Sequence, residues 1–111
     1  MEQLRNDLFK RSPYVAPGLS TKETIERIIE KVAYRFSLTV EQLKEKSRKR
    51  EVVDARATAI YIIRNTMGLS WADCSYPFGK DHATAMHNYD MFETQFQVNK
   101  KFHNKVADLI S

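Results

Sequence analysis

Apolar side chains recur at helical spacing in three long segments of the chain. The first segment follows Ser20, which opens a capping-box pattern, and it predicts a helix from about Lys22 to Phe36. The second begins at Val52 and ends before Gly68, a residue suited to a left-handed helix end. The third follows Asp81, whose carboxylate can cap a helix. The three stripes are Ile25, Ile28, Ile29, Val32, Ala33 and Phe36; Val53, Ala57, Ile60, Ile63 and Met67; and Ala85, Tyr89, Phe92 and Phe96.

Three shorter helices complete the prediction. A second capping box opens at Thr39, Ser70 caps a short helix that runs to about Ser75, and a last helix runs from about Lys101 to Ile110. No segment has a convincing strand pattern, so we expect an all-α fold with five or six helices. The inward positions expected in the first and last of these helices are Val40, Leu43, Phe102, Val106 and Ile110.

Residues 1–19 predict an arm, and residues 20–111 predict one compact domain. Pro13, Pro17 and Gly18 oppose a helix in the arm, although one helical turn near Leu4 to Phe9 is possible. A chain of 111 residues suits a single domain. We expect the arm to be able to dock onto a second copy or another protein.

Composition and charge favour a cytoplasmic protein with an anionic partner. The net charge is +4, and five of the seven residues from Lys44 to Arg50 are basic. A solvated basic turn is the alternative explanation of that run. The chain shows no apolar run long enough for a membrane span and no secretory signal at its start. One cysteine, Cys74, fits a reducing cytosol.

The segment from Ser70 to Phe96 has the outline of a helix-turn-helix. Tyr76 to Lys80 forms the turn, since Pro77 and Gly79 both oppose helix continuation. In such motifs the second helix enters the DNA major groove with its N-terminal end. Its first residues carry small polar side chains that can contact base edges, although Asp81 can also be only a cap and His82 only a solvated side chain.

Four segments resemble the C-terminal DNA-binding domain of the bacterial replication initiator DnaA. The resemblance runs from about Thr24 to Ser111, and Gly-Lys-Asp-His-Ala-Thr is its most specific part. It implies the all-helical, Trp repressor-like fold of DnaA domain IV, with a helix-turn-helix that binds a short duplex element in replication or its regulation, or in transcription regulation. The matching segments are 46–50, 53–56, 60–61 and 78–87.

The resemblance also assigns roles to individual residues. The first turn of the helix after Asp81 would read bases in the major groove, and Arg48 would reach the adjacent minor groove. Arg56, Lys80 and His87 would contact phosphates, as would the start of the helix at Ser70. The predicted DNA-contacting residues are Arg48, Lys49, Arg50, Arg56, Ser70, Lys80, Asp81, His82, Ala83, Thr84 and His87. Arg64 is a weaker candidate.

The chain departs from the family pattern at three places. Ala83 stands where the family usually has Thr, the turn at residues 78–80 is one residue shorter, and Cys74-Ser75 replaces an Ile-Gly pair. The preferred DNA sequence can therefore differ from that of the family. None of the three glycines belongs to a phosphate-binding P-loop, so we expect a stand-alone domain without the ATPase, from a bacterium, a phage or another mobile element.

We predict neither catalysis nor a cofactor. His82 and His87 are five positions apart, about 140° around a helix, and cannot grip one metal ion from a single face. Cys74 is expected in the core. The alternative function is a protein-interaction module, or a dimeric transcriptional regulator with little sequence specificity. Its surface would be aromatic: Tyr89, Phe92, Phe96 or Phe102.

Overall fold

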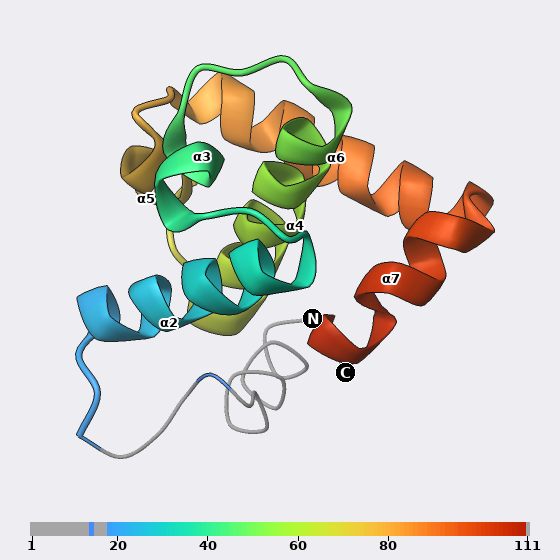
Figure 1. The fold of residues 1–111 in the computed structure, drawn as a ribbon. Coiled ribbons are helices and arrows are strands. Elements are labelled where there is room, and N and C mark those ends of the chain that lie inside the picture. Colours follow the sequence, from blue (N-terminus) through green and yellow to red (C-terminus); the bar gives the residue numbers. More distant parts are fainter. Residues whose placement is uncertain (1–13, 15–17, 111) are drawn as a thin grey trace.

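The computed structural model describes residue 14 and residues 18–110, and these form helices without a strand, as the sequence predicts. Figure 1 shows α4 in the middle of the bundle, with α2 below it, α6 behind it and α7 closing one side. The elements are α2 (Thr21–Arg35), α3 (Val40–Lys44), α4 (Arg50–Met67), α5 (Trp71–Ser75), the short 3-10 helix η1 (Tyr76–Phe78), α6 (His82–Val98) and α7 (Lys100–Ile110).

The predicted helix caps are confirmed. The Ser20 hydroxyl accepts from the Glu23 N–H at 3.1 Å, and the Glu23 carboxylate accepts from the Ser20 N–H at 3.4 Å. Thr39 and Gln42 form the same reciprocal pair at 3.0 and 2.8 Å. Gly68 ends α4 with a φ of 63°, a left-handed conformation that costs least at glycine. Local side chain to backbone bonds therefore set the starts of α2, α3, α5 and α6.

Helix α4 is the centre of the core. Ten of its 18 residues are buried, because α2 packs on one side of it and α6 on another. Ala55 and Ala59 are fully buried, and small side chains there allow neighbouring helices to approach closely. On the α6 side the rings of Tyr61 and Phe92 stack with centroids 4.1 Å apart, and Phe102 of α7 meets Phe92 edge-on at 5.4 Å. These rings join three helices into one core.

At two predicted inward positions, Val53 and Ile110, a neighbouring residue is more deeply buried. Val52 is buried while Val53 is half-buried, because α4 is enclosed on several sides and its apolar surface is wider than a single stripe. In α7, Leu109 is buried, whereas Ile110 lies only partly against the core. The last turn of α7 therefore places both Leu109 and, in part, Ile110 against the core.

Tyr14, within the predicted arm, belongs to the core. It is 2% exposed, and its hydroxyl donates to the Leu109 carbonyl at 3.0 Å. The division between an arm and a domain stays a prediction, and the possible turn near Leu4 to Phe9 lies outside the described residues. In the described part of the chain no helix is both long and apolar enough to span a membrane.

Candidate nucleic-acid interface

Helices α5 and α6 form a helix-turn-helix around a tight 3-10 turn. The Ser70 hydroxyl caps α5 by accepting from the Asp73 N–H at 3.1 Å. Helix η1 follows α5 directly, and Gly79 ends it with a φ of 63°. The Lys80 N–H then donates to the Ser75 carbonyl at 3.3 Å. The glycine turn thus reverses the chain and sets the start of α6.

The first turn of α6 presents small polar side chains to solvent. Asp81 is its N-cap and accepts from the Thr84 N–H at 2.9 Å. Hydrogen bonds from the backbone and then the side chain of Thr84 lower the pKa of the Asp81 carboxyl. His82 and Ala83 are exposed, and Thr84 is half-exposed. The cap therefore holds Asp81 and Thr84 in a fixed relation at the exposed end of the helix.

Aromatic packing holds α6 from behind. The Tyr89 hydroxyl donates to Asn65 Oδ1 at 2.9 Å, and its ring meets Trp71 edge-on at 5.2 Å. Phe92 is 1% exposed and Phe102 is 5% exposed. The aromatic side chains that could have formed an interaction surface therefore pack into the domain.

Sequence reasoning missed one exposed residue on this face, Met86. It is 45% exposed and lies one helical turn after Ala83, beside His87. The sequence contained a signal for this exposure, because Met86 is a large apolar residue outside the apolar stripe of its helix.

The basic loop between α3 and α4 carries Arg48 and Lys49 at exposed positions. Figure 1 shows this loop and the first turns of α6 on the same upper side of the molecule. The Lys49 N–H donates to the Ser47 hydroxyl at 3.2 Å, which gives the loop local order. The predicted minor-groove and major-groove residues thus belong to two separate elements, the basic loop and α6, on the same side of the molecule.

A polar triangle connects the basic loop to α6. The Arg50 guanidinium donates from Nε to Asp54 Oδ2 at 3.2 Å and from Nη2 to Gln95 Oε1 at 2.9 Å. The Gln95 amide donates in turn to Asp54 Oδ1 at 2.9 Å. Gln95 is buried, so this link is partly shielded from water. Asp54 and Gln95 were not among the predicted site residues, because the pairing joins positions 41 and 45 residues apart.

Arg56 lies beneath the basic loop and is only 6% exposed. Its Nε donates to the Leu43 carbonyl at 3.4 Å and its Nη2 to the Glu45 carbonyl at 2.5 Å. Burial lowers the pKa of the guanidinium. Arg56 therefore lies inside the protein, where its guanidinium fixes the end of α3, and it is not one of the exposed residues of the candidate interface. Arg64 is similarly engaged, 4.0 Å above the Trp71 ring.

The pair that departs from the family pattern lies inside α5. Cys74 is fully buried as predicted, and burial raises the pKa of its thiol to about 11. Ser75 is also fully buried, and its hydroxyl has no hydrogen-bond partner among the described residues. Among residues 14 and 18–110, which the structure describes, no group of three or more His, Cys, Asp or Glu side chains could hold a metal ion.

Comparisons with known proteins agree on one family. A family model described as "Bacterial dnaA protein helix-turn-helix" matches residues 25–91. The chain is 37% identical over 89 residues to the chromosomal replication initiator protein DnaA of Bacteroides thetaiotaomicron, covering 79% of this chain and 19% of that protein. The DnaA of Lactobacillus helveticus is 36% identical over 86 residues (77% and 19%), and that of Latilactobacillus sakei 32% over 93 residues (83% and 21%). The chain thus spans about a fifth of the length of these relatives.

Proposed function

The chain belongs to the bacterial DnaA helix-turn-helix family, and we propose that it binds a specific duplex DNA sequence with the first turn of α6 in the major groove. The observation that carries this proposal is the capped, exposed start of α6, held from behind by buried aromatic side chains. A rigid helix end with small polar side chains can approach base edges closely. This is the geometry that direct readout requires.

The side chains of this turn have complementary roles at bases. Asp81 accepts from a cytosine amino group, and His82 and Thr84 exchange hydrogen bonds with base edges. Ala83 offers only a methyl group, which suits contact with a thymine methyl. Met86 extends that apolar contact by one helical turn, since it is exposed on the same helix.

Cationic residues around the reading turn hold the phosphate backbone. Arg48 enters the adjacent minor groove, where the negative potential of a narrow groove favours a guanidinium. Lys49, Lys80 and His87, together with the hydroxyl of Ser70, contact phosphates. Arg56 supports this contact indirectly, because its bonds to two carbonyls fix the start of the basic loop.

We place this activity in replication-related or regulatory control, at DNA in the cytoplasm. The relatives are named chromosomal replication initiators, and this chain corresponds to about a fifth of their length. The proposal assigns the chain no catalytic step. A dimeric regulator with little sequence specificity is the competing function, and binding measurements separate the two.

The test is selection of bound sequences from a random duplex library, followed by affinity measurements at two salt concentrations. We expect a defined preferred sequence, and affinity that falls as salt rises, because phosphate contacts release counterions. The His82→Ala variant should lose about 1–3 kcal/mol of discrimination at one position of that sequence. Gln97→Ala, exposed near the other end of α6, is the control and should keep the parental preference. A library without enrichment, or no duplex binding at low salt, refutes the proposal.

A further inference from the structure

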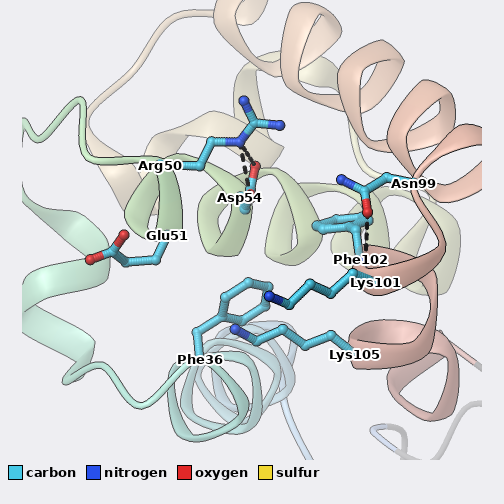
Figure 2. A pocket seen from close by; sticks show the side chains of 8 residues that line it. All are labelled: Phe36, Arg50, Glu51, Asp54, Asn99, Lys101, Phe102 and Lys105. Carbon is cyan, nitrogen blue, oxygen red and sulfur yellow. Dashed lines mark hydrogen bonds and ion pairs between the residues drawn. The ribbon is translucent and has the colours of Figure 1, made fainter.

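A second polar site lies away from the reading turn, in a pocket of about 370 Å³ between the end of α2, the start of α4 and the first half of α7. Figure 2 shows the side chains of Lys101 and Lys105 running side by side toward the ring of Phe36, with Arg50 at the opposite rim. The Lys105 ammonium lies 4.5 Å from the centre of the Phe36 ring. Two cationic groups from one helix are thus directed into the same cavity.

The pocket has positive charge that its own carboxylates do not neutralise. Asp54 is already engaged by Arg50 and by the amide of Gln95. Neither Lys101 nor Lys105 forms an ion pair within 4.0 Å with any residue that the structure describes, and Glu51 is therefore farther than that from both. An anionic ligand would gain from these ammonium groups without displacing a carboxylate from either of them.

Asn99 supplies a neutral donor beside the two lysines. Its Oδ1 accepts from the Phe102 N–H at 3.0 Å, which caps α7 and leaves the amide nitrogen as a donor. Lysine ammoniums combined with amide N–H groups suit phosphate oxygens, and a cavity of about 370 Å³ is large enough for a phosphate together with its attached sugar.

We propose that this pocket binds a phosphate of the DNA backbone and so extends the contact beyond the sequence that α6 reads. The proposal rests on the proposed function above. Arg50 connects the two regions, because it borders the pocket and follows Arg48 by two residues, so their Cα atoms are at most about 7.6 Å apart. In the proposed complex, the DNA strand that leaves the minor groove at Arg48 continues toward the rim of the pocket formed by Arg50.

The experiment compares two duplexes that carry the selected sequence, one short and one extended by about one helical turn on the side of the basic loop. The variant is Lys101→Gln with Lys105→Gln, and the matched control is Lys22→Gln with Lys31→Gln on the exposed part of α2. We expect the parent and the control to bind the long duplex more tightly. The pocket variant should lose that gain. The slope of log K against log salt concentration should also become less steep in this variant, by about 0.9 for each lost phosphate contact.

A second readout keeps the site testable without DNA. Inorganic phosphate is titrated into the parent and into Lys101→Gln, while the amide signal of Asn99 is followed by NMR. Loss of the length effect in the pocket variant supports the proposal. A phosphate response without any length effect assigns the pocket to a free phosphate and overturns the DNA assignment. Unchanged binding of both duplexes and no phosphate response overturns the site altogether. Failure of every form to bind any duplex overturns the proposed function, and the phosphate titration then decides the pocket alone.

Discussion

The buried hydroxyl of Ser75 should lower the free energy of unfolding of the protein relative to an apolar side chain of the same size. This side chain is fully buried at the end of α5 and has no hydrogen-bond partner among the described residues. Replacing it by alanine removes only the unpaired oxygen. The backbone at this position, with φ of −87° and ψ of −22°, is helical and accepts alanine without strain. The Lys80 N–H can still donate to the carbonyl of residue 75, because that bond uses the main chain.

The size of the effect follows from the desolvation of the hydroxyl. An unpaired buried hydroxyl costs about 1–3 kcal/mol, and the space left by one oxygen atom is too small to hold a water. We therefore expect Ser75→Ala to raise the free energy of unfolding by about 1 kcal/mol. For a domain of about 100 residues this corresponds to a rise in Tm of roughly 4–8 °C. Ser75→Gly should gain less, since glycine in a helix costs about 0.5–1 kcal/mol more than alanine.

Urea unfolding and calorimetry on the two variants and the parent measure the change. Ser70→Ala is the matched control, five residues earlier. Its exposed hydroxyl does have a partner, the Asp73 N–H, so its loss should destabilise the protein by about 1 kcal/mol. Opposite signs at the two serines support the reasoning. A Ser75→Ala protein that is less stable than the parent would show that the hydroxyl makes a hydrogen bond in solution and is not an unpaired buried group.

Three further changes test the supports of the interface. Arg56→Met should lower stability by about 1–3 kcal/mol, because two carbonyls at the end of α3 lose their donor, and should weaken binding to all duplexes alike; equal stability by urea unfolding would contradict this. The Asp81 carboxyl has a lowered pKa in the folded protein, so its contribution to stability is complete at neutral pH and is lost as the pH falls through that lowered value, below 3.8. Asp81→Asn should remove this pH dependence in melts recorded at several pH values, and an unchanged loss of stability in acid would exclude a contribution from Asp81. Tyr14→Phe should cost about 1 kcal/mol by loss of the bond to α7, and no change in Tm would mean that this contact adds nothing.

Short-range chemistry explains which features of the fold the sequence predicts well. The hydroxyls of Ser20, Thr39 and Ser70 and the carboxylate of Asp81 each bond to an N–H three residues later, so a few letters contain the whole interaction. The helix boundaries therefore agree with the structure to within about two residues. The burial of Leu109 in α7 was less predictable, because the core that surrounds it also contains side chains distant in the sequence, such as Tyr14.

Long-range contacts explain what the sequence could not reveal about the candidate site. Arg56 follows a basic run and has the residue type of a phosphate contact, yet α4 is enclosed on several sides and its guanidinium is buried under the loop. The exposed start of α6 was predictable, since its cap and its apolar face are local. The pocket beside α7 was not, because it forms only where three helices meet.

The polar triangle suggests why the two proposed reading elements can act together. Arg50 begins α4 directly after the basic loop, and Gln95 lies on α6, so their hydrogen bond fixes the loop relative to the helix. Asp54 accepts from both partners and so closes the triangle. A fixed separation between a minor-groove residue and a major-groove helix favours one spacing of the two contacts along the duplex, which is a source of specificity beyond the individual bases. In the proposed mode of binding, Gln95 is a positioning residue, and the spacing between the two contacts depends on it.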